Sequence, residues 1–173
     1  MDKETKLVLK KRALHLALEP QIPKDISTII EIIEFKISGE TYGIETAYVM
    51  EVYPLKDFTP LPGVPPFILG IVNVRGQLFP VVDLKKFFHL PTKGLGELNK
   101  VIIIHNHYME FGILADEIIG TNIIFFEDIL PVPLSIKGIG EKYLRGVTKD
   151  QIILLSAENI LMDKNMIVNV DVD

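Results

Sequence analysis

The stretch GIVNVRGQLFPVVDL, residues 70–84, decides the fold class of this chain. Two apolar runs lie on either side of Arg75-Gly76, a pair typical of a tight turn between strands. We therefore predict strands over 68–74 and 77–82, and a short helix through Lys86 to Phe88 that Asp83 caps. The charged side chain of Arg75 between two apolar strands suggests a role other than stabilising the fold.

The segments around this hairpin have the same character. Residues 28–37 and 41–45 predict two strands joined by a turn at 38–40, and residues 122–126 are a further strand candidate. KVIIIHNHYMEFGILADEII predicts a hairpin with a polar tip around Asn106, and LRGVTKDQIILLSAENIL predicts a hairpin followed by a short helix. Residues 45–54 fit neither the strand period nor the helix period, so both remain open.

No long amphipathic helix occurs within residues 28–173, which favours an antiparallel arrangement of short strands over βαβ units. Small barrels close such strands without leaving edges. Each half of this region also carries a proline-rich loop and a predicted strand that ends in Arg-Gly, at 75–76 and at 145–146. The sequence therefore predicts one mainly β domain built from two related barrels.

Composition excludes several functional classes. The 173 residues contain no cysteine, which rules out thiol nucleophiles and disulfide frameworks and fits a reducing compartment. A net charge of −5 argues against nucleic-acid binding, and no run approaches the roughly 20 apolar residues that span a bilayer. We expect a cytoplasmic protein, and the 48% hydrophobic content indicates apolar surface for a partner.

Residues 1–27 are expected to form a separate N-terminal helix and linker. Leu7, Leu14 and Leu18 share one stripe of a helix over residues 3–18, much of whose remainder is basic, and Pro20 ends it. Packing of this stripe on the barrel body and binding of a protein partner are both open interpretations. The stripe is too narrow for strong bilayer anchoring.

Catalytic chemistry finds little support. His105 and His107 lie two residues apart, a spacing that some metal sites use on a strand, but the sequence offers no evident third ligand. Nucleophile-elbow, Walker and HExxH motifs do not occur, and we interpret Asp116-Glu117 and Glu127-Asp128 as solvated surface. The sequence predicts a protein that is not an enzyme and binds no metal or cofactor.

Two longer motifs identify a family. FKISGETYGIETAYVMEV, followed by PLPGVPPFILGIVNVRGQLFPVVDL, resembles the chemotaxis coupling protein family, CheW, and the likeness extends over about residues 29–163. This resemblance implies two interleaved five-stranded SH3-like barrels. It also implies an adaptor that links methyl-accepting chemoreceptors to the regulatory domain of the CheA histidine kinase, within membrane-associated arrays but without membrane insertion.

The resemblance also assigns candidate site residues. Val49 and Val52 match apolar positions of the family's receptor groove, Glu51 matches their acidic neighbour, and Arg75 matches a characteristic arginine. Arg75 would orient the groove by pairing with Glu51, although a purely structural role is the alternative. Leu78 and Phe79 match the kinase-docking strand, where one should face the core and the other solvent.

Two other functions remain open. One is a small-molecule-binding or metal-binding barrel that uses His105 and His107. The other is a CheW-like adaptor of a non-flagellar chemosensory pathway. Neither a receiver domain nor a kinase core is present in these 173 residues.

Overall fold

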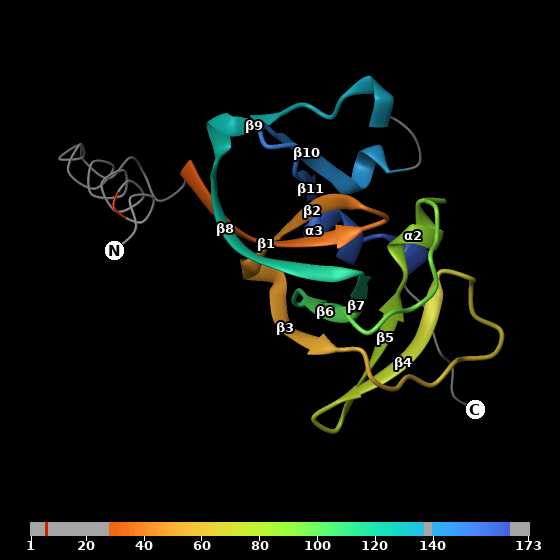
Figure 1. Ribbon diagram of the computed structural model, residues 1–173. Coiled ribbons are helices and arrows are strands. Elements are labelled where there is room, and N and C mark those ends of the chain that lie inside the picture. The colour runs from red at the N-terminus through yellow and green to blue at the C-terminus, as the bar shows by residue number, and fades with distance from the viewer. Residues whose placement is uncertain (1–5, 7–27, 137–139, 167–173) are drawn as a thin grey trace.

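The body of the protein consists of two mostly antiparallel sheets, each of which curves into a partial barrel (Figure 1). The computed structural model describes residues 6, 28–136 and 140–166. The predicted helix over 3–18 and its linker therefore lie almost entirely outside the described residues. The prediction of a mainly β fold with two barrel-like subdomains is confirmed, although the first sheet has six strands where five were expected.

The first sheet has the strand order β8-β1-β2-β11-β10-β9, and the second has the order β3-β6-β7-β5-β4. The first contains β1 (Ile29–Ile37), β2 (Glu40–Glu45), β8 (Glu117–Phe125), β9 (Ile129–Leu130), β10 (Leu144–Thr148) and β11 (Ile153–Leu155). The second contains β3 (Val49–Pro54), β4 (Ile68–Val74), β5 (Gln77–Val82), β6 (Lys100–His105) and β7 (Glu110–Ala115). Because the second sheet is inserted between β2 and β8, the two subdomains are interleaved.

Short helical segments connect the strands. Within residues 28–136 and 140–166, the α-helices are α2 (Leu84–Phe87) and α3 (Ala157–Leu161), and the 3-10 helices include η2 (Thr46–Tyr48), η3 (Phe126–Asp128), η4 (Leu134–Ile136), η5 (Glu141–Tyr143) and η6 (Lys164–Met166). Asp83 caps α2 by accepting a hydrogen bond from the Lys85 amide at 3.0 Å, as predicted. Residues 45–54 contain both open alternatives, a 3-10 turn and then β3.

Two predictions about connections are corrected. The strand expected to run through residues 110–119 is divided at Asp116, because the chain crosses there from the second sheet to the first. Arg145-Gly146 lies inside β10, which continues to Thr148, rather than at the end of a strand, and the register of β10 with β11 shifts between Leu144 and Gly146. The two Arg-Gly pairs are therefore not structural equivalents.

The core has three parts. Each barrel encloses its own apolar cluster, and a third, larger cluster lies between the two sheets. Strand β6 contributes to two of them, since Val101 and Ile103 face the second barrel's interior while Ile102 and Ile104 face the core between the barrels. A strand that is buried on both faces needs a continuous apolar run, which explains the sequence KVIII.

Gly70 permits the closure of the second barrel. Its φ of 151° accompanies a register shift between β4 and β5, and a Cβ at this position would overlap the Thr59 carbonyl oxygen. Thr59 and Ile71 exchange two backbone hydrogen bonds of 2.8 Å, which fasten the proline-rich loop to β4. A side chain at residue 70 would have to break this contact.

We expect Gly70→Ala to lower the free energy of unfolding by about 2–3 kcal/mol, from backbone strain and lost loop contacts. Chemical denaturation monitored by circular dichroism measures the change. Gly94→Ala is the matched control, because a Cβ there meets nothing within 4 Å. A Gly70→Ala protein as stable as the control would contradict this role.

Candidate functional site

An ion pair joins two segments of the second sheet that are distant along the chain. The Arg75 guanidinium, in the turn between β4 and β5, lies 3.0 Å from the Glu51 carboxylate on β3. Strands β3 and β4 are the two edges of the sheet, and Figure 1 shows the β4–β5 hairpin extending past β3. The pair therefore bridges the open side of the barrel, and the predicted pairing of these two side chains is confirmed.

The backbone at Arg75 is unusual for a residue with a side chain. Its φ is 54° and that of Gly76 is 85°, so both central residues of the turn occupy the left-handed region. The Asn73 side chain supports the turn by accepting a hydrogen bond from the Gly76 amide at 2.9 Å. Glycine or asparagine suits such a turn better, so arginine here points to a role for the side chain.

Val49 and Val52 lie on the other face of β3. They are half-buried and pack against the core between the barrels, next to the strand that carries Ile102 and Ile104. Glu51 is opposite Ile103, whose side chain faces the interior of the second barrel. The register shift between Val49 and Glu51 leaves Met50 45% exposed, an apolar residue at this surface that the sequence did not single out.

Leu78 and Phe79 point in opposite directions, as expected of adjacent strand residues, and the structure shows which of the two faces solvent. Leu78 is 62% exposed, whereas Phe79 is 2% exposed and belongs to the second barrel's core. Leu78 also borders a shallow hollow with Phe58 and Ile71. Of the two predicted docking residues, Phe79 cannot reach a partner because it is buried, and Leu78 alone can.

A partly buried ion pair connects the two sheets, with the Asp116 side chain 34% exposed. The Lys85 side chain is 3% exposed and its Nζ donates to the Asp116 carboxylate at 2.6 Å, while the Ser38 amide donates to the second carboxylate oxygen at 2.9 Å. The Asp116 carboxylate is therefore a partner of Lys85 and Ser38, which corrects its interpretation as solvated surface. No sequence signal marks Lys85, because a lysine near a helix start is normally exposed.

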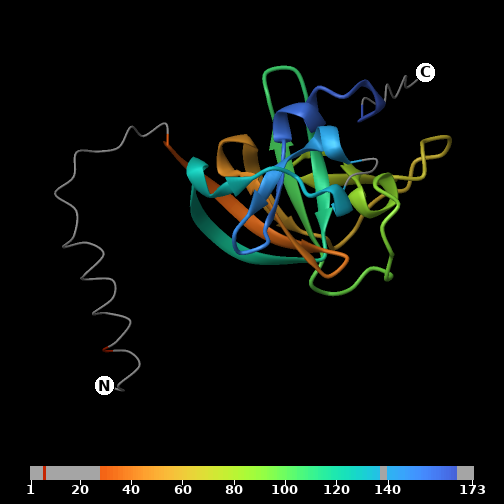
Figure 2. The ribbon, with the colours of Figure 1, turned by 90° about the horizontal axis from the view of Figure 1, so that it is seen from above.

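His105 and His107 border a hollow of about 480 Å³ between the tip of the β6–β7 hairpin and α3. Figure 2 shows this hairpin, in green, extending past the body beside the blue C-terminal segments. Strand β6 ends at His105, so His107 lies in the hairpin turn rather than on a strand, and Asn106 closes that turn through the Tyr108 and Met109 amides. Within the described residues, His, Asp and Glu side chains form no group of three that could hold a metal ion.

Several perturbed pKa values come from one hydrogen-bonded group near α3. Burial raises the pKa of Tyr143, whose hydroxyl donates to Asp163. Burial opposes ionisation of Asp163, but hydrogen bonds from Lys142, Tyr143 and the Asn165 amide outweigh it and lower its pKa. The Asp163 hydrogen bond raises the pKa of Lys142. These contacts join η5 to the end of α3, which accounts for the perturbation without a catalytic role.

Comparisons with known proteins agree with this architecture. The model of the CheW-like domain matches residues 31–165. "Chemotaxis protein CheW" of Bacillus subtilis is 30% identical over 146 residues, covering 84% of this chain and 85% of the relative. "Protein FrzA" of Myxococcus xanthus is 31% identical over 115 residues, covering 66% of this chain and 71% of the relative.

A solved structure supports the same relationship. The scaffolding protein TtCheW from Thermoanaerobacter tengcongensis superposes with a TM-score of 0.67 at 30% identity, covering 73% of this chain and 88% of that one. No helix among the described residues is long and apolar enough to cross a membrane. The chain belongs to the CheW-like domain family, whose members are non-enzymatic scaffold adaptors of chemotaxis and related chemosensory systems.

Proposed function

We propose that this protein couples methyl-accepting chemoreceptors to the regulatory domain of a CheA-type histidine kinase in membrane-associated arrays. The observation that carries the proposal is the Arg75–Glu51 pair, held by a strained turn beside the half-buried valines of β3. Membership of a scaffold family supports it.

The receptor groove of this proposal comprises Val49, Glu51, Val52 and Arg75. The two valines would contact apolar residues of the receptor's helical hairpin, since they are reachable but already packed against the core between the barrels. Arg75 is 81% exposed and Glu51 is 28% exposed, so the guanidinium can keep its partner while still meeting an incoming helix. A fixed charge beside apolar positions would set the register of that helix.

Kinase docking would rest on Leu78. This leucine is 62% exposed on β5, at the border of a hollow that could receive an apolar side chain. It lies on the same β4–β5 hairpin as Arg75, three residues further along the chain. Receptor and kinase would therefore meet this protein at neighbouring points of the second subdomain.

Calorimetric titration tests the proposal directly. The purified protein is titrated with the regulatory domain of the CheA kinase encoded by the same organism, and separately with a receptor-tip fragment. Micromolar binding to the kinase domain supports the coupling role. Absence of binding to every such kinase, with a sample shown to be folded, would overturn it.

We expect Leu78→Glu to weaken binding of the kinase regulatory domain at least about tenfold, because the substitution places a carboxylate in an apolar contact. The melting temperature should change little, since residue 78 is exposed. Leu98→Glu is the matched control, because Leu98 is also 62% exposed but lies outside the hairpin. Equal binding by both variants would remove Leu78 from the interface.

A pathway other than flagellar chemotaxis remains a second candidate. The similarity to Protein FrzA, which covers 71% of that relative, favours it. Both candidates require an adaptor with the same two surfaces. Titration against each CheA-type kinase of the organism in turn would separate them, because only the cognate kinase should bind tightly.

A further inference from the structure

Three apolar side chains form an exposed patch where β1 begins and β8 ends. Ile29, Ile123 and Phe125 are 40%, 57% and 46% exposed. Ile29 is paired directly with Phe125, and Ile123 lies two residues earlier on the same strand, so all three share one face of the sheet. Ile124 points the other way into the first barrel's core. We call these three residues the β8 patch.

The β8 patch lies at an edge of the first sheet, where β8 has a neighbour on one side only. Apolar side chains that gather on one face of an edge strand normally receive a covering element. The described residues leave the three side chains exposed. The candidate occupants are another part of the chain, a second copy and a partner.

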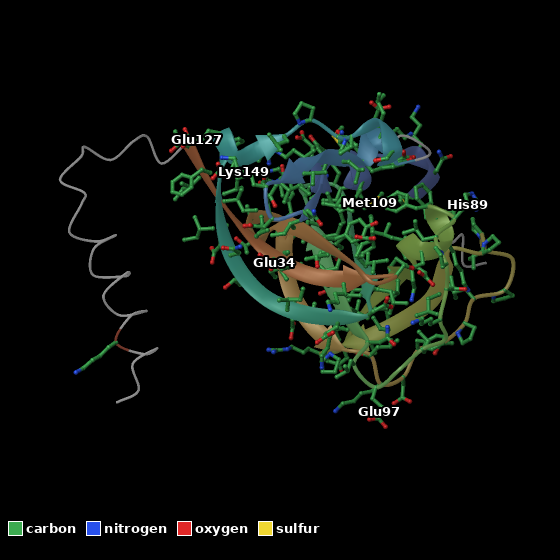
Figure 3. All side chains as sticks on the ribbon, turned by 45° about the horizontal axis from the view of Figure 1, so that its top comes forward. Glu34, His89, Glu97, Met109, Glu127 and Lys149 are labelled. Atoms are coloured by element: carbon green, nitrogen blue, oxygen red, sulfur yellow. The ribbon has the colours of Figure 1, made fainter. Side chains whose placement is uncertain are left out.

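Two carboxylates, Glu31 and Glu127, lie beside the β8 patch. Glu31 is opposite Ile123, and its contact among the described residues is the Thr46 hydroxyl. Glu127 follows two residues after Phe125 and lies beside the start of β1 in Figure 3. Among the described residues, Arg145 pairs with Glu45, and Lys149 pairs with Asp128 while also interacting electrostatically with Glu127. The patch therefore suits an occupant with an apolar stripe and a positive charge.

We propose that the chain's own N-terminal segment, residues 3–18, covers the β8 patch. Its sequence carries five Lys and Arg residues against one Glu, together with the stripe of Leu7, Leu14 and Leu18. The stripe would contact the three apolar side chains, and the basic side chains would lie near Glu31 and Glu127. A second copy of the body is disfavoured, because it would bring two sets of these carboxylates together.

Chain connectivity makes this contact accessible. Residues 19–27 join the segment to Thr28, which directly precedes Ile29 of the patch. Nine residues reach at most about 30 Å, and sixteen residues in a helix are about 24 Å long, so the segment can lie along the end of β8. A short tether also keeps the local concentration of the segment near the millimolar range, so that a small contact suffices.

Amide hydrogen exchange of the full chain, followed by mass spectrometry, tests the proposal. We expect amides of residues 7–18 to exchange at least about tenfold more slowly than in the Phe125→Glu variant, because a charge in the patch expels the stripe. Leu14→Glu changes the segment without touching the barrels and should have the same effect on those amides. Leu98→Glu, at an exposed leucine in the loop before β6, should leave the protection intact.

Three results would overturn the proposal. Residues 7–18 could exchange at the rate of an unstructured peptide in the unchanged protein. Protection could rise with protein concentration, together with a doubled mass by light scattering, which would make a second copy the occupant. Protection could also survive both Phe125→Glu and Leu14→Glu, which would place the segment elsewhere. None of these results depends on whether the protein binds a receptor or a kinase.

Discussion

Asp116→Ala is expected to lower the free energy of unfolding by about 3 kcal/mol or more, which is the largest stability effect that we expect of a single substitution here. The change leaves the Lys85 ammonium, whose side chain is 3% exposed, without its carboxylate. It also removes the acceptor of the Ser38 amide at the turn between β1 and β2. Urea denaturation at neutral pH measures the loss.

Two companion variants separate charge from packing. Lys85→Met in the Asp116→Ala background should recover much of the lost stability, because the uncompensated charge is then gone. Asp116→Asn keeps a hydrogen-bond acceptor and should be intermediate. An Asp116→Ala protein within about 1 kcal/mol of the unchanged one would mean that the Lys85 ammonium finds water instead of remaining buried.

This pair also bears on the relative placement of the two subdomains. Lys85 belongs to α2, which follows β5 of the second sheet, whereas Ser38 lies in the turn between β1 and β2 of the first sheet. Asp116 lies where the chain crosses between the two sheets. The proposed receptor groove depends on that placement, because its valines pack against the core between the barrels. Weakening the link should therefore disturb the groove as well as stability.

The strands could be predicted from the sequence because their signals are local. Arg75-Gly76 and Ser38-Gly39 each place two positive φ angles between apolar runs, and a two-residue turn fixes the pairing of its strands. Asp83 and Ser156 precede short helices and cap them. Each of these turns and caps is determined by residues that are adjacent in the sequence.

The contacts between distant segments could not be predicted in the same way. In the sequence, Asp116 resembles a surface residue because it stands beside a second acidic residue, Glu117, which is indeed exposed. Its partner Lys85 is 31 residues away along the chain. The exchange of strands between the sheets gives no periodic signal either, since β2 and β11 are paired in parallel across more than 100 residues. The family resemblance supplied the interleaving and the pairing of Glu51 with Arg75.

Glu51→Arg is expected to weaken binding of a receptor-tip fragment about a hundredfold, on the proposed function, because it sets two guanidinium groups against each other beside the groove valines. Calorimetric titration with the fragment measures this loss. Stability should change by less than about 1 kcal/mol, since Arg75 is 81% exposed and exposed pairs contribute little. Binding of the kinase regulatory domain serves as the internal control.

Charge reversal at both positions distinguishes a groove-orienting pair from two independent contacts. Glu51→Arg combined with Arg75→Glu restores the attraction but exchanges the two charges, so receptor binding should recover in part. Full recovery would mean that the receptor senses only the shape held by the pair. No recovery, with Arg75→Ala as harmful as Glu51→Arg, would mean that the guanidinium itself contacts the receptor. If Arg75→Ala has no effect on receptor binding, Arg75 has a structural role only, despite its left-handed backbone conformation.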